Sequence, residues 1–286
     1  MTEKEWNAAD LLTTTANFLG EKGLSSPRLE AELLLSAVLG LTRVQLYVNY
    51  ERILSPAELE AYRVLIRRRI AHEPAAYILG RKEFYLLNLK VTPQTLIPRP
   101  ETELLVDEAL SLVKGLADPL IVDIGCGSGA IALALAKNLP QAQIVATDIS
   151  AEALAVAQEN ARNLGLERVE FLLGDLTEPL NGRAFSLVCA NLPYVPTGDF
   201  PSLDPGVTRF EPRLALDGGP DGLAVYQRLL SQVKNVLKPQ GYLLMEIHPP
   251  TLEALEQIIR ASGLNFIRPI ADFNRTNRLV LAQRPE

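Results

Sequence analysis

One stretch limits the possible folds more than any other: "LIVDIGCGSGAIALALA", which begins at Leu120. A short apolar run ends in three closely spaced glycines, Gly125, Gly127 and Gly129, and an alanine-rich helical pattern follows. Glycine lets a chain turn tightly and lets a ligand approach the backbone without a Cβ in the way. A strand, a glycine turn and a helix in this order are typical of a nucleotide-binding α/β unit.

The same alternation continues to the end of the chain. We expect strands near residues 120–124, 143–147, 168–172, 185–190, 242–247, 265–270 and 278–283, and helices near 101–115, 129–138, 151–164, 222–237 and 251–262. Strands that alternate with helices of this length predict an α/β fold, a mainly parallel doubly wound sheet with right-handed crossovers. The last two strands lack a helix between them, which predicts an antiparallel edge strand. Ligands of such sheets bind at the carboxyl ends of the strands.

The first quarter of the chain has a helical pattern instead. Ser26 is expected to cap one helix, and Ser55 with Glu58 has the spacing of a capping box at the start of another. The β-leaning stretch from residue 77 to 91 predicts a short hairpin around Gly80 and Asn88. The expected domains are therefore a helical domain at 1–75, a hairpin linker at 76–97 and an α/β domain at 98–286.

Composition limits where the protein works and what it binds. Among 286 residues, 48% are hydrophobic, yet no segment has the roughly 18 apolar residues that a membrane span needs. The first residues carry mixed charge without an apolar export signal, so we expect a soluble, cytoplasmic protein and a monomer. Two cysteines and two histidines argue against a disulfide framework and a metal site. Arg67, Arg68 and Arg69 form a basic cluster, either a solvated helix face or a partner-binding patch.

Acidic residues follow the second and third expected strands. Asp148 lies roughly 20 residues after the glycine turn, where a carboxylate can accept hydrogen bonds from ribose hydroxyls. The alternative is helix capping by Asp148 or Ser150. Asp175 could bind an adenine amino group with Leu176 beside the ring, but an aspartate after Gly174 could equally form a turn.

The fourth expected strand ends in "SLVCANLPYVP", where an apolar run stops at Asn191. A buried amide is costly without a partner, so Asn191 is expected to face a polar ligand. Pro193 fixes its own φ and restricts Leu192 to extended conformations, which holds the Leu192 carbonyl in a set direction. Tyr194 offers an aromatic wall for a flat group. An ordinary Asn-Pro turn is the simpler interpretation, but it leaves the other strand-end residues unexplained.

Together these motifs resemble the HemK/PrmC-type peptide chain release factor glutamine methyltransferases. The likeness rests on "FYLLNLKVTPQTLIPRPETELLVDEAL", "DIGCGSGAIALALA" and "EPRLALDGGPDGLAVYQRLL", and it covers essentially the whole chain. It implies a class I S-adenosylmethionine-dependent methyltransferase fold. It also implies that the cofactor is bound by Gly125, Cys126, Gly127, Ser128, Gly129, Asp148, Asp175, Leu176 and Asn191.

The resemblance implies a reaction as well. A methyl group would pass from S-adenosylmethionine to the side-chain amide nitrogen of the glutamine in a release factor's Gly-Gly-Gln loop, leaving S-adenosylhomocysteine. Asn191, Leu192, Pro193 and Tyr194 would hold that glutamine, with the Asn191 Oδ1 and the Leu192 carbonyl accepting its two N–H hydrogens. The family usually has Asn-Pro-Pro-Tyr, so Leu192 is a departure, as is Leu176 where some members carry an aromatic residue. The N-terminal helices and the arginine cluster would dock a class I release factor.

Other functions fit parts of the pattern. The tetrapeptide at Asn191 could hold any planar amino group, as in an adenine-N6 or cytosine-N4 nucleic-acid methyltransferase. The net charge of −6 and the lack of a basic, aromatic-interleaved segment argue against direct nucleic-acid binding. The glycines with Ala130 also fit G-x-G-x-x-G/A, so an NAD oxidoreductase stays possible, as does a non-catalytic cofactor-binding module.

Overall fold

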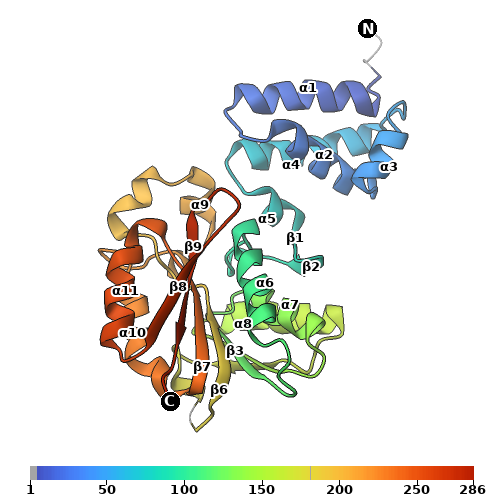
Figure 1. The fold of residues 1–286 in the computed structure, drawn as a ribbon. Coiled ribbons are helices and arrows are strands. Elements are labelled where there is room, and N and C mark those ends of the chain that lie inside the picture. Colours follow the sequence, from blue (N-terminus) through green and yellow to red (C-terminus); the bar gives the residue numbers. More distant parts are fainter. Residues whose placement is uncertain (1–4, 181) are drawn as a thin grey trace. The chain divides into compact units, whose positions relative to one another are not determined.

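The computed structural model describes residues 5–180 and 182–286 (Figure 1). The chain forms two units. One contains the chain up to Gly80 together with Pro205–Phe210, and the other contains Arg81–Asp204 with Glu211–Glu286. The domain limits expected from the sequence, 1–75, 76–97 and 98–286, stay predictions, and residues 1–4 lie outside the described part. Among the described residues, no helix is both long and apolar enough to cross a membrane.

The N-terminal unit is built from helices that bury one face each. They are α1 (Ala8–Glu21), α2 (Pro27–Leu39), α3 (Arg43–Val48), α4 (Pro56–Ile70) and α5 (Ala75–Leu79). The capping box of Ser55 and Glu58 is confirmed at the start of α4. The expectation for Ser26 was wrong in one respect: it precedes α2, but its side chain makes no capping hydrogen bond. Pro27 at the first helical position needs no N–H partner, which lessens the need for a cap.

The hairpin is shorter than the sequence predicted. Residues 77–79 belong to α5, which Gly80 ends in a left-handed conformation with φ 68°. The strands are β1 (Arg81–Phe84) and β2 (Leu87–Lys90), and the turn between them lies at Tyr85 and Leu86. Asn88 is therefore inside a strand and not in a turn. Glycine acts here as a helix terminator, a role that the local pattern does not distinguish from a hairpin turn.

The second unit contains a seven-stranded sheet in the order β5-β4-β3-β6-β7-β9-β8. Its strands are β3 (Leu120–Ile124), β4 (Gln143–Asp148), β5 (Glu170–Leu173), β6 (Phe185–Ala190), β7 (Leu237–Glu246), β8 (Asn265–Ala271) and β9 (Asn277–Gln283). Strands β3 to β7 pair in parallel, β9 runs antiparallel to β7, and β8 pairs antiparallel with β9 at the edge. The predicted mainly parallel sheet with an antiparallel edge is confirmed.

Helices cover both faces of this sheet (Figure 1). They are α6 (Glu103–Leu112), α7 (Ala130–Asn138) and α8 (Ala151–Leu164) on one face, and α10 (Ala224–Gln232) and α11 (Leu252–Ala261) on the other. Each face of the sheet packs against its helices in a hydrophobic core, and successive strand residues point to opposite faces. Ile121 packs with the first group of helices and Val122 with the second. Strands β4 and β5 extend the sheet on one side of β3, whereas β6 lies on the other. The order in which strands are added to the sheet therefore reverses between β3 and β6, which are parallel neighbours. Such a point is where α/β sheets bind ligands.

Two expected helices differ from the structure. The helix expected at 101–115 is a 3₁₀ turn at Pro100–Thr102 followed by α6. The helix expected at 222–237 ends at Gln232, because β7 already begins at Leu237. No pattern in the sequence predicted α9 (Pro205–Phe210) or the short 3₁₀ turns at Glu178–Leu180, Thr197–Ser202, Arg213–Ala215 and Pro249–Thr251.

Candidate functional site

The glycine turn after β3 is tied to the end of β4. The N–H groups of Gly125 and Cys126 donate to the Thr147 carbonyl at 2.8 and 2.9 Å. Gly125 has φ +75°, and a Cβ there would lie 2.8 Å from Cδ2 of Leu192. Glycine is required at this position because the backbone is left-handed and the strand-end residue of β6 packs directly against it.

Asp148 holds the other side of the same turn. Its Oδ2 accepts from the N–H of Gly127 at 2.8 Å, and its Oδ1 accepts from the N–H of Ser150 at 2.9 Å. Ser150 caps α8 by accepting from the Ala153 N–H at 3.1 Å, so the cap is the serine and not the aspartate. Burial raises the pKa of Asp148. Each carboxylate oxygen retains a lone pair that can accept from a ligand.

Asp175 and Leu176 follow β5, and the backbone of Leu176 has an unusual conformation. Leu176 is buried and has a left-handed φ of 51°, and its carbonyl accepts from the Thr147 hydroxyl at 3.3 Å. The Asp175 Oδ2 is already bound by the guanidinium of Arg228 on α10. An adenine amino group would therefore share this carboxylate with an arginine, a partner that the sequence did not suggest.

The Asn191 side chain belongs to a hydrogen-bond chain that begins on β7. Its Nδ2 donates to Thr102 Oγ1 at 3.2 Å, and the Thr102 hydroxyl donates to Glu246 Oε2 at 2.7 Å. The Tyr194 hydroxyl donates to Glu246 Oε1 at 3.1 Å. Burial is the main cause that raises the pKa of Glu246. Sequence reasoning missed Thr102 and Glu246, although an acid at the end of the apolar run "YLLME" was a usable signal.

Leu192 is buried, and its carbonyl oxygen, like any other, has two lone pairs. The Tyr226 hydroxyl lies 3.4 Å from that carbonyl but closer to the Glu246 backbone carbonyl. A tyrosine hydroxyl carries one hydrogen, and the nearer acceptor takes it. The Leu192 carbonyl is therefore still able to accept from a ligand. Its side chain fills the space above Gly125, so leucine is held by packing where the family's proline is held by its ring.

Two of the predicted site residues, Gly129 and Tyr194, make close contacts within the protein. A cavity lies at these strand ends, and neither Gly129 nor Tyr194 is among the described residues that line it. A Cβ on Gly129 would lie 3.1 Å from Leu133 and 3.2 Å from Ala157, so this glycine lets α7 approach α8. The Tyr194 ring is stacked with His248, with centroids 6.2 Å apart.

The cavity has a volume of about 980 Å³. The other predicted site residues line it: Gly125, Cys126, Gly127, Ser128, Asp148, Asp175, Leu176, Asn191, Leu192 and Pro193. Further walls come from the segment after β2, which includes Arg99 and Thr102, from the first residues of α7 and α8, from residues near Asp217 and from α10. Arg99 pairs with the buried Glu211 at 2.5 Å, and Glu211 also accepts from the Ile97 N–H, which fixes this wall.

A buried acid lies beneath the glycine turn. Asp123 has no exposed surface, and its Oδ2 accepts from the Ala132 N–H at 3.1 Å. Burial, aided by the charge of Asp148, raises the pKa of Asp123 to about 7. Burial also raises the pKa of the Cys126 and Cys189 thiols, which makes them poor nucleophiles. Within 5–180 and 182–286, no cluster of potential ligands could hold a metal ion.

The predicted basic cluster lies in the N-terminal unit on α4. Arg68 pairs with Glu73 at 2.5 Å and Arg69 with Glu30 at 2.5 Å, whereas Arg67 is paired at 3.3 Å with Glu60 and is 66% exposed. The Arg69 side chain is only 14% exposed, and its charge is paired with Glu30 inside the unit. Of the three, Arg67 has the most exposed side chain.

The chain matches known proteins over nearly its whole length. Models of protein families match it as a PrmC N-terminal domain at residues 10–80 and as a methyltransferase domain at residues 118–267. It is 45% identical over 282 residues to the release factor glutamine methyltransferase of Geobacter sulfurreducens, covering 98% of each chain. It is also 45% identical over 270 residues to the protein of that name from Moorella thermoacetica, covering 94% of this chain and 95% of the relative.

Proposed function

The chain belongs to the release factor glutamine methyltransferase family, and from that premise we propose that it transfers a methyl group from S-adenosylmethionine to a glutamine side chain of a release factor. The observation that carries the proposal is the pair of acceptors at the end of β6, the Asn191 amide and the Leu192 carbonyl, on the wall of the large cavity. Two acceptors side by side suit the –NH₂ group of an amide. The glutamine of the Gly-Gly-Gln loop is the proposed target.

The cavity walls fit the cofactor. The left-handed turn at Gly127 leaves the backbone open to a ligand, since a Cβ there would meet nothing within 4 Å, and Asp148 has lone pairs available for ribose hydroxyls. Leu176 offers an apolar surface and Asp175 a carboxylate for the adenine. S-adenosylmethionine would supply an electrophilic methyl group on its sulfonium.

The residues at the end of β6 would act by positioning. An amide nitrogen is a poor nucleophile because its lone pair is delocalised into the carbonyl. By accepting both N–H hydrogens, Asn191 and Leu192 would orient the nitrogen and favour the positive charge that develops on it. The alkylated nitrogen is acidic and can lose its proton to water, so no protein base is needed. We also propose that the enzyme acts in the cytoplasm, since its protein substrate works there. We propose in addition that it is a monomer.

The target is tested by incubating the protein with labelled S-adenosylmethionine and a class I release factor, beside the release factor's Gln→Ala variant in the Gly-Gly-Gln loop. We expect label in the first and none in the second. Equal labelling of both would exclude this glutamine as the acceptor. Parallel incubations with DNA and RNA test the nucleic-acid alternative, which predicts labelled nucleic acid.

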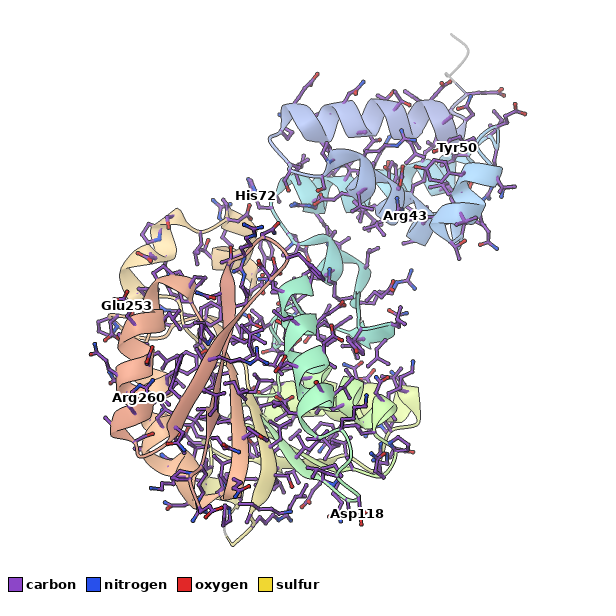
Figure 2. All side chains as sticks on the ribbon, in the orientation of Figure 1. Arg43, Tyr50, His72, Asp118, Glu253 and Arg260 are labelled. Atoms are coloured by element: carbon purple, nitrogen blue, oxygen red, sulfur yellow. The ribbon has the colours of Figure 1, made fainter. Side chains whose placement is uncertain are left out.

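The cofactor site is tested at Asp148. We expect Asp148→Ala to weaken S-adenosylmethionine binding about tenfold to 100-fold, because hydrogen bonds to a charged group are worth about 1.5–3 kcal/mol. Isothermal titration calorimetry measures this change. The matched control is Asp118→Ala, at an exposed position before β3 (Figure 2), which should bind like the original chain. Equal affinities for the two variants would contradict the assignment.

A further inference from the structure

A buried carboxylate, that of Glu246, begins the chain of hydrogen bonds that ends at Asn191. Glu246 is 3% exposed, and its two oxygens face the hydroxyls of Thr102 at 2.7 Å and Tyr194 at 3.1 Å. Burying an ionised group is costly, and here two hydroxyls stabilise it directly. The arrangement demands an explanation beyond packing, because a leucine would fill the same space in an apolar strand.

The chemistry of the chain fixes the direction of every hydrogen bond in it. While Glu246 is ionised, its carboxylate can only accept, so the Thr102 hydroxyl then donates its one hydrogen to Glu246. The Thr102 oxygen can then only accept, and the group that donates to it must be the Nδ2 of Asn191, 3.2 Å away. The Asn191 oxygen is left as the atom offered to the cavity, which Asn191 lines.

We propose that Glu246 is a positioning residue, which acts through Thr102 to present the oxygen of the Asn191 amide, and not its nitrogen, to the substrate. This inference rests on the proposed function. It also explains specificity: with Asn191 and the Leu192 carbonyl both held as acceptors, the site favours a glutamine amide and disfavours a glutamate carboxylate, which has no hydrogen to donate. A reversed amide would place a donor against the substrate's own N–H.

Protonation of Glu246 would reverse the chain, since a neutral carboxyl can donate to Thr102. Burial raises the pKa of Glu246, the hydroxyls of Thr102 and Tyr194 oppose that shift, Glu101 adds to it and Arg278 opposes it. The Tyr226 hydroxyl donates to the backbone carbonyl of Glu246. Activity should therefore fall toward acidic pH, at a higher pH than for an ordinary glutamate.

The experiment compares Glu246→Gln, Thr102→Val, Thr102→Ser and the double variant Glu246→Gln/Thr102→Val. The amide of Glu246→Gln can donate to Thr102 and lets Asn191 flip, so we expect kcat to fall about tenfold or more, a change worth about one hydrogen bond. Thr102→Ser keeps the hydroxyl and should stay near the original rate. The double variant should be no slower than Thr102→Val, because Glu246 acts on Asn191 through the Thr102 hydroxyl, which Thr102→Val already removes. The matched control is Glu253→Gln, exposed on α11 (Figure 2).

A second readout does not need turnover. Isotope-edited NMR of the Asn191 side-chain NH₂, assigned by its loss in Asn191→Ala, should shift alike in Glu246→Gln and Thr102→Val. Glu246→Gln should also lose the acidic limb of the rate profile.

Original kcat and pH profile in Glu246→Gln, or additive losses in the double variant, would overturn the inference. If Glu246→Gln does not fold, equal rates and equal NMR spectra for Thr102→Val and Thr102→Ser would overturn it. A protein that methylates no release factor yet shows the NMR shifts would refute the proposed function and leave the positioning role standing.

Discussion

Replacing Asn191 by alanine is expected to lower the rate of methyl transfer at least about 100-fold, as the loss of one preorganised hydrogen-bond partner does in other active sites. The side chain lies at the end of β6, and only its Nδ2 bonds to another side chain, Thr102. Its removal should therefore affect the reaction far more than the fold. Single-turnover rates with saturating cofactor and release factor measure the loss, and circular dichroism checks that the variant is folded.

The matched control for this substitution is Asn274→Ala, at an exposed position between β8 and β9. It should keep the original rate. If folded Asn191→Ala turned over at nearly the rate of this control, the acceptor role of Asn191 would be wrong, and with it the proposed grip on the substrate amide.

Gly222→Ala is expected to damage both stability and turnover. Gly222 has φ +76°, and a Cβ there would overlap the Tyr194 carbonyl oxygen. A left-handed alanine costs about 1–2 kcal/mol and overpacking about 1–3 kcal/mol, so the free energy of unfolding should fall by about 3 kcal/mol. The overlap pushes directly on the Asn191–Tyr194 corner, and a shift of about 1 Å at a reacting group can cost about 100-fold in rate.

Gly115→Ala separates the two effects. Gly115 is also left-handed, with φ +89°, but a Cβ there meets nothing within 4 Å. Denaturant unfolding should show only the backbone cost of about 1–2 kcal/mol in this control, and its turnover should be unchanged. Equal losses in the two variants would mean that the contact between Gly222 and Tyr194 does not support the site.

The contact also gives a physical reason for the segment "LDGGPDGL". Gly218 would bring a Cβ within 2.8 Å of the Tyr194 Cα, and its N–H donates to the Val195 carbonyl at 2.9 Å. Two glycines thus let this segment lie directly against the backbone that follows Asn191. The sequence could connect the segment to the family, but it could not show that the glycines support the corner.

Periodicity predicted the strands and helices of the sheet well where a glycine marks an end of the element, as Gly125 does after β3 and Gly165 after α8. Strands β3 and β6 and helix α8 begin and end where expected, at 120–124, 185–190 and 151–164. Strand β7 begins earlier than expected because Pro239 and Gly241, normally turn residues, lie inside it. Local propensity gives way there to pairing with the neighbouring strands.

The missed site residues share a different cause. Thr102 and Glu246 are 144 residues apart, and Asp175 and Arg228 are 53 apart, so no local pattern links them. Asn191 was predictable because an amide at the end of a buried strand stands out in the sequence. Its partners were not, because a threonine beside acidic residues and an arginine on an amphipathic helix have many ordinary roles. The expectation that Tyr194 faces a ligand stays a prediction, and the bond from its hydroxyl to Glu246 is a further contact that no local pattern indicated.

The most direct test of the account is to locate the transferred methyl group in the product. The release factor is incubated with the protein and S-adenosylmethionine, digested, and analysed by tandem mass spectrometry. The account predicts one added methyl group on the side-chain nitrogen of the glutamine in the Gly-Gly-Gln loop, and its loss with Asn191→Ala. A methyl group on another residue, or on that glutamine at an unchanged rate with Asn191→Ala, would contradict it.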